Sequence, residues 1–140
     1  MHTRGEFVPA SETEARERYD RVGPVAQTAV RETAKGMGLD REEYEERVTP
    51  EVVARVRDAL FASLLEVSVG AREEFEAWAD DREGDVTVVG SDNVDNVAWH
   101  APPFAEGVAA TFQDEEDAAV ETLRRQAFGR IYRERFHDES

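Results

Sequence analysis

Apolar residues recur every three or four positions through most of the first 64 residues, which is the spacing of amphipathic α-helices. Ser11 and Glu14 have the form of a capping box, and Gly23-Pro24 is typical of a helix end followed by a new start. Thr49 and Pro50 are typical of an N-cap and a first helical residue. The pattern predicts four helices: residues 12–22, a second ending near Gly38, a short one after Asp40, and a long one from Pro50.

After Leu64 the hydrophobic period changes from that of a helix to the alternation of strands. Residues 65–69 alternate and predict a short strand. Three β-branched runs bounded by turn residues predict further strands at 86–90, 97–100 and 108–112, which we expect to form an antiparallel meander. A helix is predicted around Phe75 and Trp78. A last helix is predicted after Asp114, and the residues beyond Gly129 either continue it or turn off.

These elements predict the α+β class: a helical N-terminal half packed with a small, mainly antiparallel sheet and a C-terminal helix, in two layers. At 140 residues the chain is expected to form one domain, residues 1–140. We expect residues 1–10 and the tail 138–140 to be flexible.

The charge is strongly acidic, with 32 Asp and Glu against 17 Lys and Arg, of which Lys35 is the only lysine. A lysine-poor acidic surface is typical of proteins that stay soluble at molar salt, because salt screens the repulsion between carboxylates. The competing interpretation is an acidic mimic of nucleic acid, which the even spread of charge disfavours. Cysteine is absent and no apolar stretch approaches 20 residues, so we predict a cytoplasmic protein of a halophile with no disulfides and no membrane contact.

Familiar catalytic and metal-binding patterns do not occur in the sequence. Gly36-Met37-Gly38 lacks the Lys and Ser or Thr of a phosphate loop, and no pair of histidines has zinc-ligand spacing. Residues 91–96 place their oxygens at the wrong positions for a calcium loop, with Val97 where the glycine belongs. We therefore expect a loop at 91–96, no metal and no cofactor.

Residues 99–104 hold a histidine and two prolines between two aromatic side chains. Trp99, His100 and Phe104 would form a ligand pocket if His100 were a general base or an orienting donor. The interpretation we favour is structural: strand alternation places Trp99 in the core and His100 on the opposite, solvent-facing side.

Residues 124–137 form a basic segment on an acidic chain, with five arginines and Glu134 as the only acidic residue. One interpretation is a site for phosphate or an acidic partner that uses Arg124, Arg130 and Arg133, with Tyr132 and Phe136 as stacking platforms. The interpretation we favour is that these arginines pair with carboxylates of the same chain.

Four segments, DALFASLLEV (58–67), REEFEAW (72–78), VAWHAPPF (97–104) and LRRQAFGR (123–130), are similar to those of a small uncharacterised protein family of halophilic archaea. That resemblance implies a halophilic archaeal source, and the family has no known activity to carry over. For function we favour a non-enzymatic cytosolic protein-binding or regulatory module. The alternatives are a nucleic-acid-associated accessory protein using the C-terminal arginines, disfavoured at native salt, and a small-molecule enzyme or sensor at Trp99, His100 and Phe104.

Overall fold

The computed structural model describes residues 1–91 and 93–137. Its helices are α1 (Glu12–Gly36), α2 (Arg41–Arg47), α3 (Pro50–Leu64), α4 (Arg72–Asp81), α5 (Glu116–Ala127), a π-helical turn (Phe128–Tyr132) and α6 (Arg133–His137). Its strands are β1 (His2–Arg4), β2 (Val67–Ala71), β3 (Val86–Val89), β4 (Asn96–His100) and β5 (Gly107–Phe112). The α+β class with a helical N-terminal half and a C-terminal helix is confirmed.

Helix α1 runs through Gly23 and Pro24 without a break, so the prediction of two separate helices is wrong. An internal proline costs a helix about 3 kcal/mol, but the buried stripe of α1 continues across it from Val22 to Ala26. Pro24 leaves the Asp20 carbonyl without its helical donor, and Arg57 of α3 donates from Nε to the neighbouring Tyr19 carbonyl oxygen at 3.0 Å. A Cβ on Gly23 would lie 3.3 Å from the Arg57 guanidinium carbon, so the glycine makes room for this arginine.

The five strands form one sheet in the order β1-β2-β4-β5-β3, in which β3 runs parallel to β5 and the other pairs are antiparallel. The predicted meander of β3, β4 and β5 is therefore wrong in its order. Strand β4 is buried from Val97 to His100 and takes a central place between β2 and β5. Strand β3 is only partly buried and lies at the edge.

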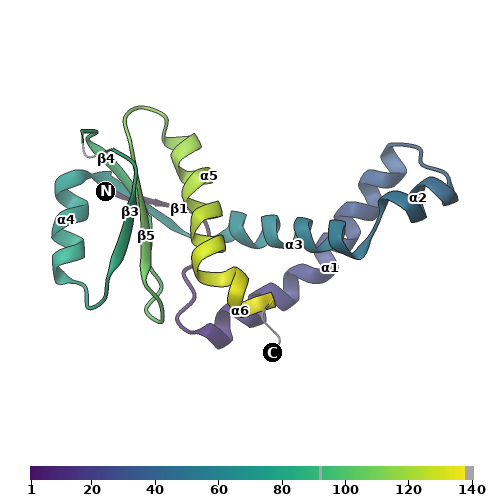
Figure 1. Ribbon diagram of the computed structural model, residues 1–140, viewed down its shortest axis with the longest axis horizontal. Helices are drawn as coiled ribbons and strands as arrows, with labels where there is room; N and C mark the ends of the chain where they lie inside the picture. The colour runs from purple at the N-terminus through teal and green to yellow at the C-terminus, as the bar shows by residue number, and fades with distance from the viewer. Residues whose placement is uncertain (92, 138–140) are drawn as a thin grey trace.

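Helices cover both faces of the sheet, so the domain has three layers where the sequence predicted two (Figure 1). Helix α4 packs on one face through Phe75, against Trp99 and Val97. Helix α5 and the end of α3 pack on the other, where Phe61 and Leu123 belong to the larger core. Because both faces are covered, β4 has no solvent-facing side.

The N-terminal residues, which the sequence predicts to be flexible, include β1, whose residues pair with Val67–Val69 of β2. Past Gly129 the chain continues α5 through the π-helical turn into α6. The predicted tail 138–140 and residue 92 of the predicted loop lie outside the described residues.

The helical arm, defined here as residues 23–57, extends away from the sheet (Figure 1). It consists of the C-terminal part of α1, the whole of α2 and the N-terminal part of α3, with α2 at its far end. Helices α1 and α3 pack against each other along it, and α5 lies between the sheet and the root of the arm. Over residues 1–91 and 93–137, no helix combines the length and apolarity needed to cross a membrane.

Candidate functional site

His100 lies at the end of β4 and is only 1% exposed. Its Nδ1 atom is 2.8 Å from the Glu66 carbonyl oxygen, and its Nε2 atom is 2.7 Å from the Tyr132 hydroxyl of the π-helical turn. A carbonyl oxygen can only accept, so Nδ1 carries the proton and Nε2 accepts from the tyrosine hydroxyl. Both polar atoms of the neutral ring are therefore satisfied inside the protein.

Burial lowers the pKa of His100 to about 4, with a smaller contribution from the positive charge of Arg124. Burial also raises the pKa of Tyr132 above its ordinary value. His100 and Tyr132 are therefore both neutral near pH 7, and neither ring is accessible to a ligand from solvent. This arrangement stabilises the contact between the sheet and the C-terminal helices.

The prediction that His100 faces solvent is wrong, whereas the prediction that Trp99 is buried is confirmed at 2% exposure. Strand alternation does place the two side chains on opposite faces, as the sequence indicates. The second face is covered by α5 and the π-helical turn, which the period of β4 alone does not reveal. Phe104 is partly buried, with its ring edge-on to that of Tyr132.

The C-terminal arginines contact several different neighbours. Arg124 donates from Nε to the Leu65 carbonyl at 3.0 Å, and the Arg133 guanidinium lies 5.6 Å from the centroid of the Phe128 ring. Arg135 pairs with Glu12 at 3.0 Å. Within the described part of the chain, the other four arginines of this segment have no carboxylate within 4.0 Å, so the expected internal ion pairing is wrong for them there.

Arg130 and Arg135 line a hollow of about 330 Å³ beside the end of the sheet, together with Thr87 and Glu106. Arg130 donates from Nε to the Gln126 side chain at 3.2 Å. The Glu106 carboxylate accepts from the Thr87 hydroxyl at 2.7 Å, and Arg135 is already paired with Glu12. The carboxylates offset the arginines in this hollow, so its charge does not favour an anion.

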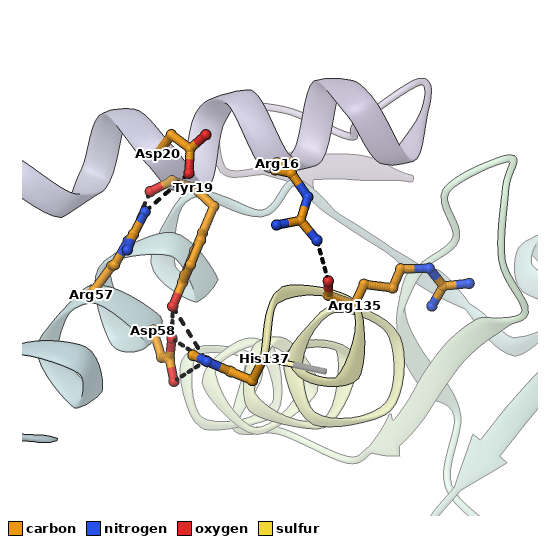
Figure 2. A network of polar contacts seen from close by, with 7 residues as sticks. All are labelled: Arg16, Tyr19, Asp20, Arg57, Asp58, Arg135 and His137. Atoms are coloured by element: carbon orange, nitrogen blue, oxygen red, sulfur yellow. Dashed lines mark hydrogen bonds and ion pairs between the residues drawn. The ribbon is translucent and has the colours of Figure 1, made fainter. Parts of the chain in front are cut away.

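A polar network at the root of the arm joins α1, α3 and α6 (Figure 2). The Tyr19 hydroxyl donates to Asp58 Oδ1 at 2.6 Å, and His137 Nε2 is 3.2 and 3.3 Å from the two Asp58 carboxylate oxygens. Arg57 lies 3.9 Å above the centroid of the Tyr19 ring and pairs with Asp20 at 3.2 Å. These contacts fix the helical arm to the body of the domain.

A Tyr, an Asp and a His in mutual contact have the composition of an acid–base site, but their electrostatics oppose catalysis by the tyrosine. Burial and the neighbouring Asp58 raise the pKa of Tyr19 well above its ordinary value. An activated tyrosine requires a lowered pKa, which is the opposite shift. Tyr19 also stacks on Phe136, with ring centroids 4.2 Å apart, as expected of a packing residue.

Two open hollows flank the α1–α3 pair along the helical arm. The first, of about 260 Å³, is lined mainly by apolar side chains: Ala29, Val30, Met37, Leu39, Val52 and Val56. The second, of about 550 Å³, includes Gln27, Tyr44, Val53 and Ala54. Gln27 and Ala29 are two positions apart, which is more than half a helical turn, so the hollows lie on different sides of α1.

Apolar side chains on the helical arm are also directly exposed. Val25 is 57% exposed and Met37 is 60% exposed. Val25 and Ala29 lie about one turn apart on α1, and Ala29 lines the first hollow together with Met37, the C-cap residue of the helix. The sequence contains these apolar residues, but apolar residues at helical spacing usually lie in a core. Their exposure follows from the projection of the arm, which the sequence does not reveal.

Over residues 1–91 and 93–137, no group of three His, Asp or Glu side chains is placed to hold a metal ion. No curated protein and no solved structure matches the chain. A family model described as a family of unknown function, DUF5809, matches residues 6–133. The match covers nearly the whole chain, from before α1 to the start of α6, and the chain belongs to this family.

Proposed function

We propose that the chain is a non-enzymatic protein-binding module whose helical arm binds a helical segment of a partner protein. The observation that carries this proposal is the apolar hollow lined by Met37, Val52 and Val56 on an element that projects from the domain. Extended apolar grooves between two helices are a recurrent site for a third, amphipathic helix. The lack of cysteine is compatible with work in a reducing cytosol.

The packing of the helical arm explains why apolar surface remains on it. Its interior consists of α1 residues such as Ala26, Val30 and Ala34, which are buried against α3. On α3, Val52, Val53 and Val56 are only partly buried, because two helices cannot enclose each other. A third helix in the hollow would bury the remaining surface, which contributes about 25 cal/mol per Å².

The charge of the helical arm also favours association. It contains six basic and seven acidic residues, a net charge of −1, whereas the rest of the chain carries −14 of the total −15. The protein therefore repels an acidic partner least at the arm. This supports the arm over the sheet body as the place where a partner protein approaches.

The test begins with a photo-crosslinking amino acid in place of Met37, used in a lysate of the source organism at its native salt. A crosslinked protein is identified, purified and titrated calorimetrically against two matched variants, Met37→Asp in the arm and Val88→Asp on the edge strand. Both replace an exposed apolar side chain with a carboxylate, so both are expected to fold. We expect at least a tenfold loss of affinity with Met37→Asp and no change with Val88→Asp.

The proposal fails if no protein crosslinks at the arm. It also fails if the purified partner binds Met37→Asp as tightly as the unaltered protein. Loss of binding only with Val88→Asp would instead identify the open edge of β3 as the interaction surface.

A further inference from the structure

The charged side chains that line the two hollows of the helical arm are all arginines. Arg47 lines the first hollow, and Arg31 and Arg57 line the second. No carboxylate lines either one, although acidic residues outnumber basic residues 32 to 17 in the whole chain. The lining is thus opposite in sign to the surface of the protein as a whole.

Two of these arginines are available to a partner. Arg57 is held by Tyr19 and Asp20 at the root of the arm. Arg31 donates to the Thr28 hydroxyl at a long 3.4 Å, and within the described residues neither Arg31 nor Arg47 has a carboxylate within 4.0 Å. Both guanidinium groups thus keep donors for an incoming carboxylate, which an arginine can bind through two parallel hydrogen bonds.

Several carboxylates of the helical arm are engaged elsewhere. Glu32 pairs with Lys35 at 3.6 Å, and Glu45 pairs with Arg41 at the same distance. Asp40 and Glu43 form the capping box of α2, in which each side chain accepts from the other residue's backbone N–H. A third hollow, of about 450 Å³ at the tip, contains Asp40 and Glu45 as well as basic residues that include Arg31, so the arginine-only lining belongs to the two hollows along α1 and α3.

We infer that the segment bound by the helical arm is an amphipathic helix with an acidic flank. This inference rests on the proposed function and names the chemistry of the partner. The apolar stripe of the segment packs on Met37, Val52 and Val56, and its carboxylates bind Arg47, which lines the same hollow.

The overall charge of the protein makes this inference sharply testable. A net charge of −15 attracts a basic peptide and repels an acidic one at long range. Preference for an acidic peptide can therefore come only from local contacts with arginines. Non-specific electrostatic binding would give the opposite order.

The probes are two 18-residue helical peptides with the same leucine stripe, one flanked by Glu and the other by Lys. Fluorescence anisotropy is measured at the lowest KCl concentration at which circular dichroism shows the protein folded. We expect the Glu peptide to bind at least tenfold more tightly than the Lys peptide. Arg47→Gln should weaken binding of the Glu peptide about tenfold, because a charge-assisted contact is lost.

The matched control is Arg55→Gln, on the same helical arm. It changes the net charge equally, but Arg55 is exposed and lines neither hollow. This control should leave the affinity for the Glu peptide unchanged. Equal weakening by the control and by the Arg47 variant would show that net charge alone is sensed, and would overturn the inference.

The failure of the inference differs from the failure of the proposed function. If the Lys peptide binds as tightly as the Glu peptide and Met37→Asp abolishes both, the arm is a docking site but its partner is not acidic. If neither peptide binds, or binding survives Met37→Asp, the proposed function fails as well. A dimer that Met37→Asp dissociates in light scattering would make a second copy the occupant, and would also overturn the acidic-partner inference.

Discussion

His100 Nε2 and the Tyr132 hydroxyl oxygen are 2.7 Å apart, which joins the end of β4 to the π-helical turn through a buried hydrogen bond. The hydroxyl donates to the neutral imidazole, whereas protonation of Nε2 would reverse the bond, leave the hydroxyl hydrogen without this acceptor and bury a positive charge. The folded protein therefore binds the His100 proton much more weakly than the unfolded chain does.

Stability should fall as the pH drops from about 6.5 to 4 because of His100. Its folded-state pKa of about 4 is below the ordinary 6.5, so in this window the unfolded chain takes up a proton that the folded protein does not. The contribution is fully present above pH 6.5 and its loss amounts to roughly 3 kcal/mol. Urea unfolding of the natural protein and of His100→Gln across this window measures it. An equal pH dependence in both would contradict the assignment.

Trp99→Ala should destabilise the protein by roughly 3 to 5 kcal/mol, the usual cost of deleting a buried aromatic side chain. Trp99 packs against Phe75 and Trp78 with ring centroids 5.2 and 5.5 Å away, and forms the centre of the core beneath α4. The exposed Val88 provides the control, since Val88→Ala should change stability by less than about 0.5 kcal/mol. Chemical denaturation of the two variants gives both values, and comparable losses would refute the packing argument.

Salt should determine whether the protein stays folded. A net charge of −15 on 140 residues is self-repulsive when unscreened, and the Debye length grows from about 3 Å in 1 M salt to about 10 Å in 0.1 M salt. We expect helical circular dichroism to be lost on dialysis from molar KCl to about 0.1 M. An unchanged melting temperature over this range would remove the argument for a halophilic source.

Nucleic acid should not bind measurably at molar KCl. Phosphate contacts weaken steeply as salt rises, because each neutralised phosphate releases counterions. In the structure Arg124 contacts a backbone carbonyl, Arg130 a glutamine and Arg133 an aromatic ring, so the basic segment is distributed over different neighbours. Anisotropy with labelled RNA and DNA tests this. Micromolar binding at native salt that is lost in Arg130→Ala with Arg133→Ala would make the C-terminal segment the functional site.

The local signals in the sequence predicted most elements because they act over a few residues. Thr49 with Pro50 set the start of α3, and Asp40 capped α2, as both do in the structure. The β-branched run at 86–89 formed a strand as predicted. Even the opposite directions of Trp99 and His100 followed from the period of a strand.

The sequence by itself thus determined the α+β class, the acidic charge and the exclusion of cysteine chemistry. Tertiary structure decided what each face meets, because burial depends on residues distant in the chain. Arg57 of α3 donates a hydrogen bond to the backbone of α1 near Pro24. The Tyr132 hydroxyl bonds to His100 from 32 positions away in the chain, and β2 takes the place beside β4 that the sequence predicted for β3. The projection of the helical arm is likewise a tertiary fact: Met37 continues the helical spacing of the buried Ala26, Val30 and Ala34, but Met37 itself is exposed on the arm.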